Sequence, residues 1–131
     1  LSLHDALPIC GSLALFYENG IGVEQNFTTA LAYYQHACES GDAESCARAG
    51  QMYEQGLGAE KSLSKSAGFY HEACVLGSAQ SCVQAGGMYY QAKGVEQDVR
   101  KALGLFKRAC ELGEPSGCKN YEMLKVNRWF E

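Results

Sequence analysis

Apolar side chains recur at helical spacing in three similar stretches of the chain, near residues 26–41, 62–77 and 98–113. Each stretch opens on a residue that caps helices well and closes at a glycine, which favours a helix from the cap to about Glu39, Val75 or Glu111. The caps are Asn26, Ser62 and Asp98, the glycines are Gly41, Gly77 and Gly113, and the apolar positions are Leu31, Tyr34 and Cys38; Ala67, Tyr70 and Cys74; Leu103, Phe106 and Cys110.

A different helix is predicted directly after each of these glycines. It begins near Asp42, Ser78 or Glu114 and runs through AESCARAGQMYEQ in the middle of the chain. Gly56, like Gly20 before it, suits the left-handed residue that ends a helix. Ala92 holds this position in the third copy, so Gly94 is an alternative end there. Recurring residues of this helix are expected in the core or at close helix contacts: Ala14, Gly50 and Gly86; Phe16, Met52 and Met88; Tyr17, Tyr53 and Tyr89.

The chain therefore repeats with a period of 36 residues, marked by Cys10, Cys46, Cys82 and Cys118. A fixed period of this length predicts an all-α solenoid, in which each unit buries its apolar face against its neighbours. The units are 10–45, 46–81 and 82–117. Residues 118–131 lose the pattern and are expected to form a capping helix, with Tyr121, Leu124 and Trp129 facing the last repeat.

The first nine residues, LSLHDALPI, break the repeat and resemble the translation of a sequencing-library adapter. We therefore set residues 1–9 aside as a non-native segment without packed structure and expect the solenoid to be truncated at its N-terminus. The alternative is a genuine, divergent N-terminal segment.

Composition narrows the function classes. The chain has 131 residues, 47% of them hydrophobic, with 15 acidic and 11 basic side chains and a net charge of -4. This suits one compact domain and argues against binding nucleic acid, which needs a basic surface. No apolar run is long enough to span a membrane.

The unit C-x-x-[LA]-[AG]-x-[FM]-Y-x-x-[GA]-x-G-[VA]-E, followed by A-C-x-x-G, resembles the Sel-1-like repeat over residues 10–118. This resemblance implies a right-handed superhelix of helix–turn–helix units related to the tetratricopeptide repeat. The added cysteines resemble those of cysteine-rich bacterial members often labelled beta-lactamase-like. Mitochondrial assembly factors with cysteine-rich repeats are less similar.

The cysteine spacing predicts three disulfides, Cys38–Cys46, Cys74–Cys82 and Cys110–Cys118, with Cys10 free. In each pair one cysteine ends a helix and the other begins the next, so a helical hairpin brings them within bonding distance. Such bonds indicate an oxidising compartment, either periplasmic or secreted. Zinc is the alternative, with His36 and His71 near the cysteines, but the short ligand spacing of zinc sites is absent. We expect neither metal nor cofactor.

The beta-lactamase-like label raises the question of catalysis. Ser62 and Lys65 match S-x-x-K by letters, but the Ser-Asp-Asn and Lys-Thr-Gly elements of serine beta-lactamases are absent. Ser62 is therefore interpreted as a helix cap. Glu24, Glu60 and Glu96 recur in the loops, where a structural role is favoured over that of a general base. A non-enzymatic protein is favoured; the alternative is a cell-wall-related protein that binds or slowly hydrolyses penicillin-like compounds.

The resemblance also implies that the first helix of each pair lines the concave face of the superhelix. There we expect a binding surface for an extended segment of a protein or peptide, because amides can donate to and accept from a peptide backbone. Arg48 could hold a carboxylate, and Tyr90 offers a rigid apolar surface. The alternative is a merely solvated helix face. The candidate residues are Asn19, Arg48, Gln51, Gln55, Gln84, Tyr90 and Gln91.

Overall fold

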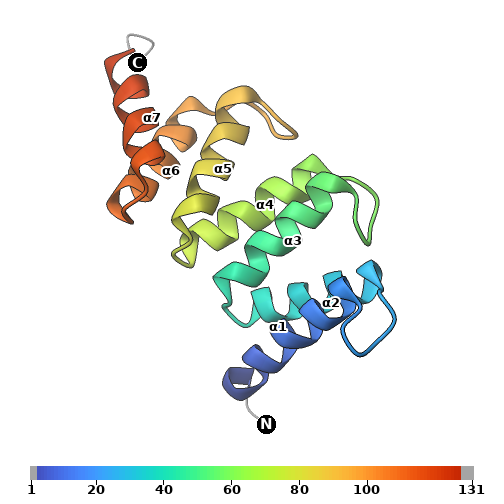
Figure 1. The fold of residues 1–131 in the computed structure, drawn as a ribbon. Helices are drawn as coiled ribbons and strands as arrows, with labels where there is room; N and C mark the ends of the chain where they lie inside the picture. Colours follow the sequence, from blue (N-terminus) through green and yellow to red (C-terminus); the bar gives the residue numbers. More distant parts are fainter. Residues whose placement is uncertain (1–2, 128–131) are drawn as a thin grey trace.

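The computed structural model describes residues 3–127, with side chains from residue 10 onward, and over this range the chain forms seven α-helices and no strand (Figure 1). The all-α solenoid predicted from the 36-residue period is confirmed. Successive helices pack side by side along the chain. The helices are α1 (Leu3–Asn19), α2 (Phe27–Glu39), α3 (Ala43–Gln55), α4 (Leu63–Val75), α5 (Ala79–Gln91), α6 (Val99–Glu111) and α7 (Pro115–Val126).

The second helix of every repeat is capped as its sequence predicts. The side chains of Asn26, Ser62 and Asp98 each accept a hydrogen bond from the backbone N–H three residues later, at 3.0, 3.2 and 3.0 Å. Each cap satisfies one N–H group that the first turn of a helix leaves without a partner. The three repeats therefore begin their second helices in the same register.

The first helix of every repeat ends at the same place, whatever residue stands there. Gly56 ends α3 with φ 72°, and Ala92 ends α5 with φ 55°. The expectation that Gly94 could replace Ala92 as the helix end is wrong. The loop that follows the helix explains why the helix ends at Ala92. The last residue of this loop is hydrogen-bonded to the end of the helix in all three repeats. Asn26, Ser62 and Asp98 each donate a backbone hydrogen bond to the carbonyl of the equivalent tyrosine, at 2.8 to 3.0 Å.

Gly94 is instead needed for a close contact with the preceding repeat. Its φ is 78°, and a Cβ there would collide with Leu63 at the start of α4. Within the helices, a Cβ on Gly86 would lie 2.7 Å from the Phe106 ring, and one on Gly50 would lie 3.2 Å from the Ser66 carbonyl oxygen. These small residues permit the close helix approach that the sequence predicts.

The repeating core is confirmed in the second and third units but not throughout the first. Met52 and Met88 are buried, whereas Phe16 at the equivalent position of α1 is 41% exposed. Met52 packs against Leu31 of the preceding second helix, and Met88 packs in the same way against α4. Within the described residues no second helix precedes α1, which leaves Phe16 uncovered.

The three predicted disulfides are all present. Their Cα–Cα distances are 4.6 Å for Cys38–Cys46, 4.5 Å for Cys74–Cys82 and 4.4 Å for Cys110–Cys118. Each joins the end of a second helix to the start of the next first helix, while Cys10 is free and half-buried. The bonds therefore connect each repeat covalently to its neighbour.

The first and last helices lie at the two ends of the described solenoid. Helix α1 begins at Leu3, so residues 3–9 lie in the same helix as the residues that follow them. The assignment of residues 1–9 as a non-native segment stays a prediction. Helix α7 begins at Pro115 with Glu114 as its cap, which confirms the helix start predicted near Glu114. Leu124 is buried against Phe106 and Tyr121 packs beside it, so α7 covers the last repeat as expected. Trp129 lies outside the described residues.

Among the described helices, none is both long enough and apolar enough to cross a lipid bilayer.

Candidate functional site

A groove of about 700 Å³ crosses the face formed by the first helices of the three repeats. Helices α1, α3 and α5 supply most of its walls, and two tyrosines of the second helices reach into it. The lining residues are Gly11, Ser12 and Leu15; Asp42, Glu44, Ser45, Ala47, Arg48 and Gln51; Ser78, Gln80, Ser81 and Gln84; and Tyr34 and Tyr70.

Three of the seven residues predicted for peptide binding line this groove, namely Arg48, Gln51 and Gln84. The other four lie near the C-terminal ends of the same helices, where their side chains are exposed beyond the groove. These are Asn19, Gln55, Tyr90 and Gln91. The structure thus brings together the predicted residues that precede the last turn of α3 and α5.

Sequence reasoning missed the wall formed by the helix starts. Asp42 and Ser78 were interpreted only as caps, and Ser45 and Ser81 were not singled out. The side chains of Asp42 and Ser45 hydrogen bond to each other, and the Ser78 hydroxyl lies 2.9 Å from that of Ser81. The signal was available, because equivalent residues of parallel helices lie along one edge of a solenoid.

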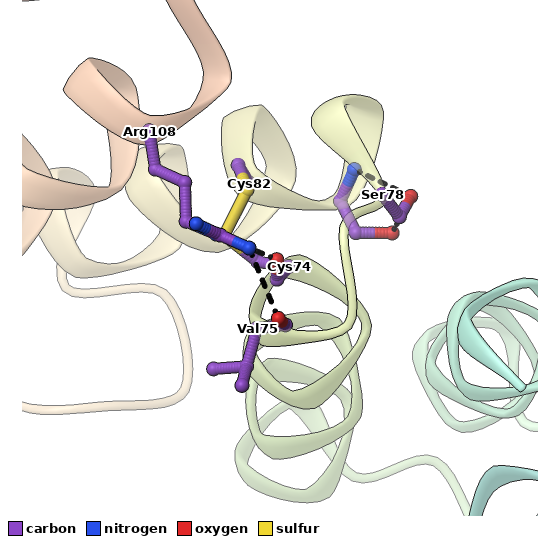
Figure 2. The surroundings of a disulfide bond; sticks show 6 residues. Cys74, Val75, Ser78, Cys82 and Arg108 are labelled. Atoms are coloured by element: carbon purple, nitrogen blue, oxygen red, sulfur yellow. Dashed lines mark hydrogen bonds between the residues drawn. A yellow bond between two sulfur atoms is a disulfide. The ribbon is translucent and has the colours of Figure 1, made fainter. Parts of the chain in front are cut away.

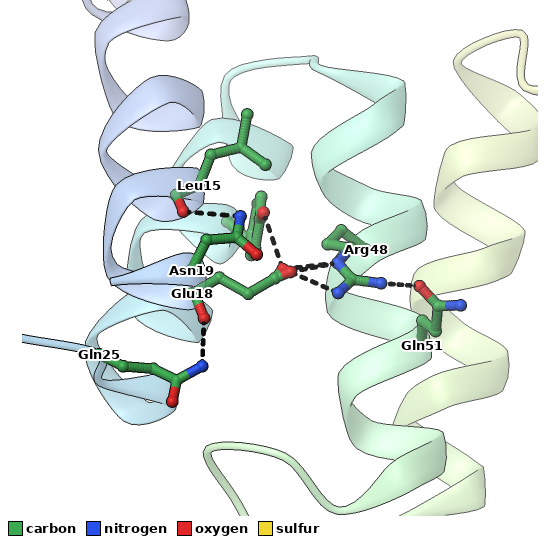
Figure 3. A network of polar contacts seen from close by, with 7 residues as sticks. Leu15, Glu18, Asn19, Gln25, Arg48 and Gln51 are labelled. Atoms are coloured by element: carbon green, nitrogen blue, oxygen red, sulfur yellow. Dashed lines mark hydrogen bonds and ion pairs between the residues drawn. The ribbon is translucent and has the colours of Figure 1, made fainter. Parts of the chain in front are cut away.

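An ion pair between Arg48, which lines the groove, and the buried Glu18 joins the first two repeats (Figure 3). Nε of Arg48 donates to both carboxylate oxygens of Glu18, at 2.7 and 2.8 Å, and a second guanidinium nitrogen also contacts this carboxylate. Tyr34 donates its hydroxyl to Glu18 at 3.2 Å, and Arg48 donates to the side-chain oxygen of Gln51. The carboxylate that Arg48 holds is therefore one of the chain's own.

The network reinforces the ordinary protonation states of Arg48 and Tyr34. The hydrogen bond to Glu18 raises the pKa of Arg48, and burial together with the Glu18 carboxylate raises the pKa of Tyr34 to about 12. At neutral pH the guanidinium is thus charged and the phenol is protonated. Only 6% of the Glu18 side chain is exposed, so its negative charge depends on Arg48 for compensation.

A related arrangement occurs in the second repeat and is absent from the third. Tyr70 donates its hydroxyl to Glu54 at 3.0 Å, and Nζ of Lys93 lies 3.1 Å from the same carboxylate. Burial and the bond to Glu54 raise the pKa of Tyr70. In the third repeat the two positions carry Phe106 and Tyr90. The bond between a tyrosine of the second helix and a carboxylate of the first helix is therefore confined to the first two repeats.

The groove carries an excess of negative charge. Asp42 and Glu44 line its wall, and its only lining cation within the described residues, Arg48, is neutralised by Glu18. A partner that brings positive charge would therefore be attracted to this face.

The pair that matches S-x-x-K has a structural role in this fold. The Ser62 hydroxyl oxygen accepts a hydrogen bond from the Lys65 backbone N–H, and Nζ of Lys65 lies 5.4 Å from the centre of the Tyr53 ring. The loop carboxylates Glu24, Glu60 and Glu96 are all exposed. In the part of the chain that the structure describes, no three His, Cys, Asp or Glu side chains are grouped to hold a metal ion.

Comparison with known proteins identifies the repeat. The family model of the Sel1 repeat matches residues 11–42, 43–78 and 79–114. No curated protein matches the chain significantly.

Solved structures share the fold. A Sel1 repeat protein from Oxalobacter formigenes superposes with a TM-score of 0.83 at 24% identity, covering 92% of this chain and 49% of its own. A protective antigen of uropathogenic Escherichia coli with an SLR fold has a TM-score of 0.77 at 27% identity, covering 88% and 25%. Cysteine rich protein B of Helicobacter pylori has a TM-score of 0.70 at 28% identity, covering 89% and 92%. This chain thus spans half or less of the first two proteins and most of the third.

Proposed function

The chain belongs to the Sel1 repeat family, and from this premise we propose that it is a non-enzymatic scaffold that binds an extended segment of a partner protein across α1, α3 and α5. Sel1 repeats are helical scaffolds that typically mediate protein interactions. The observation that carries the proposal is the groove, which runs over three consecutive repeats on one face. A hollow shared by three repeats suits an extended chain, as expected of the binding surfaces of solenoids.

Side-chain amides supply the means of holding a peptide backbone. Gln51, Gln80 and Gln84 line the groove, and each amide can donate and accept. The exposed amides of Asn19, Gln55 and Gln91 lie in one column further along the same helices and would extend this surface. Tyr90 lies beside that column and offers a rigid apolar contact with a polar tip.

Charge favours a segment that carries lysine or arginine. Asp42 and Glu44 contribute two negative charges to the groove wall, whereas the charge of Arg48 is internally balanced. Rim charges mainly accelerate association and select partners rather than supply most of the affinity.

The disulfides bear on where this binding occurs. Three bonds that join successive repeats need an oxidising environment to form and persist. The proposed setting is therefore the periplasm or the cell exterior.

Screening of the purified, oxidised protein against an array of ten-residue peptides tests the proposal. The best peptide should bind Q51A/Q84A at least tenfold more weakly, equivalent to about 1.4 kcal/mol. Lys107, which is exposed on α6, supplies the control variant K107A, with unchanged affinity expected. A parallel triple variant, N19A/Q55A/Q91A, reports whether the site extends along the amide column.

Charge preference is tested separately. D42N/E44Q should weaken binding of basic peptides, while E60Q/E96Q removes the same charge from exposed loops and should not. Absence of any peptide that depends on the groove would contradict the scaffold proposal. Hydrolysis of nitrocefin by the same preparation would support the alternative, a beta-lactamase-like protein that acts on penicillin-like, cell-wall-related ligands.

A further inference from the structure

An arginine connects the second helices of the last two repeats (Figure 2). Arg108 extends from α6 to the C-terminal end of α4, where Nε donates to the Cys74 carbonyl and a terminal guanidinium nitrogen donates to the Val75 carbonyl, both at 3.0 Å. Carbonyls in the last turn of a helix carry its negative dipole end and lack partners within the helix. The guanidinium bonds to two of these groups at once, and the Cys74 carbonyl also accepts from the Gly77 backbone N–H.

No arginine occupies the equivalent position between α2 and α4. Glu72 occupies the position 36 residues before Arg108, and Cys38 and Glu39 stand where α4 has Cys74 and Val75. A hollow of about 300 Å³ lies here, lined by Cys38, Glu39, Lys65, Gly68, Phe69 and Glu72. It is separate from the groove across the first helices and shares no lining residue with it.

We propose that this hollow binds an arginine side chain of a partner protein. The incoming guanidinium would meet the C-terminal end of α2, as that of Arg108 meets the C-terminal end of α4. The contact that Arg108 makes within the chain is an example, in the same fold, of the recognition that we propose for this hollow. This site goes beyond the peptide groove of the first helices and does not depend on it.

Charges around the hollow favour a cation. Glu39 and Glu72 are exposed at its rim, and neither forms an ion pair with another residue in the described range. Lys65 is the one lining residue of positive charge, and its Nζ lies over the Tyr53 ring. The lining therefore has a net negative charge. The two carboxylates offer the planar, two-pronged hydrogen bonding that arginine makes best.

Shape favours arginine over lysine. Phe69 supplies an aromatic ring in the lining, and Gly68 leaves the neighbouring wall without a side chain. A guanidinium is planar, stacks on aromatic rings and loses less hydration than an ammonium group. A lysine ammonium also has several N–H donors, but it lacks the fixed, planar pair of donors with which a guanidinium meets two adjacent carbonyls.

The test uses N-acetyl-L-arginine amide as a probe, with N-acetyl-L-lysine amide for comparison, in a titration followed by ¹H–¹⁵N NMR spectra of the oxidised protein. We expect saturable shifts of the backbone amides of Glu39, Gly68, Phe69 and Glu72, in the millimolar range expected for one side chain. The lysine analogue should bind at least fivefold more weakly. Equal binding of both probes, or shifts that do not saturate at these residues, would overturn the proposal.

Two substitutions at Glu72 sharpen the test. E72R places a guanidinium from the chain itself where Arg108 lies in the next groove, so the hollow should be filled and probe binding lost. E72Q keeps the shape but removes a carboxylate, and should weaken binding at least threefold. E60R makes the same charge change as E72R on an exposed loop and should bind like the unsubstituted protein. Retained binding in E72R, with its spectrum otherwise native, would contradict the proposed location.

Discussion

Arg48 holds the buried carboxylate of Glu18 across the boundary between the first two repeats, with Nε 2.7 Å from one oxygen and 2.8 Å from the other. The residues are thirty positions apart in the chain. In the next repeat Gln84 replaces Arg48, and Glu54 is held by Tyr70 and Lys93 instead. The face of the proposed peptide groove is thus built differently at each repeat boundary.

Removing Arg48 should cost more stability than removing both partners. R48M leaves the Glu18 carboxylate buried without its cation, and we expect a loss of about 2 kcal/mol in the free energy of unfolding, since Arg48 is itself one-third exposed. The double variant E18Q/R48M should be more stable than R48M alone. Urea unfolding of R48M, E18Q, E18Q/R48M and the parent checks this. Strictly additive losses would contradict the coupling.

Replacing Ala92 by glycine should stabilise the protein. Its φ of 55° lies in the left-handed region, which costs a residue with a Cβ about 1 kcal/mol relative to glycine. A92G is therefore expected to raise the unfolding free energy by about 1 kcal/mol. The reverse substitution G56A, at the equivalent end of α3, should lower it by a similar amount. A lower melting temperature for A92G than for the parent would contradict the view that the positive φ of Ala92 destabilises the protein.

Replacing Ser66 by alanine should also stabilise the protein. Its hydroxyl is buried without a hydrogen-bond partner among the described residues, whereas the equivalent positions carry the fully buried Ala30 and Ala102. An unsatisfied buried hydroxyl costs roughly 1 kcal/mol or more, so S66A is expected to stabilise the protein by about 1 kcal/mol. The exposed neighbour Ser64 provides the control S64A, for which denaturant unfolding should show little change.

The disulfide between the second and third repeats should contribute measurably to stability. Cys74 and Cys82 are eight residues apart, and closing so short a loop is worth roughly 2–3 kcal/mol in the chain-entropy model. The free energy of unfolding of C74A/C82A, measured in urea, should therefore be lower than that of the parent by that amount.

Alkylation of the unreduced parent, followed by mass measurement, should label one thiol, that of Cys10. Several labelled thiols would contradict the bonding pattern.

Mild acid should destabilise the protein through His71. Burial, and then the charge of Lys101, lower the pKa of His71 below its usual value of 6.5. The unfolded chain therefore binds a proton more readily, so this contribution is present above about pH 6.5 and is lost as the pH falls through the lowered pKa. Between pH 7.5 and 5.5 the parent should lose more unfolding free energy than H71Q, as measured in urea. An equal loss in both would exclude this role.

Much of the fold was predictable from local chemistry. Asn26, Ser62 and Asp98 cap their helices within three residues, and the pairs such as Cys38–Cys46 lie on adjacent helix ends. Such features depend on residues near each other in the chain, so a period of 36 residues is enough to place them. Local spacing could not predict which of the seven candidate residues line the groove. The structure shows that only three of them do, namely Arg48, Gln51 and Gln84.

The sequence by itself determined the helices, their register, the repeat and the disulfides, because short-range spacing and helix capping decide all four. Only the tertiary structure decided that Arg48 is neutralised by Glu18, and that Arg108 reaches the end of α4 while its counterpart Glu72 leaves a hollow open at the end of α2. These outcomes depend on which side chains of neighbouring repeats meet. That is set by the angle and distance at which one repeat packs on the next, and no single repeat contains this information.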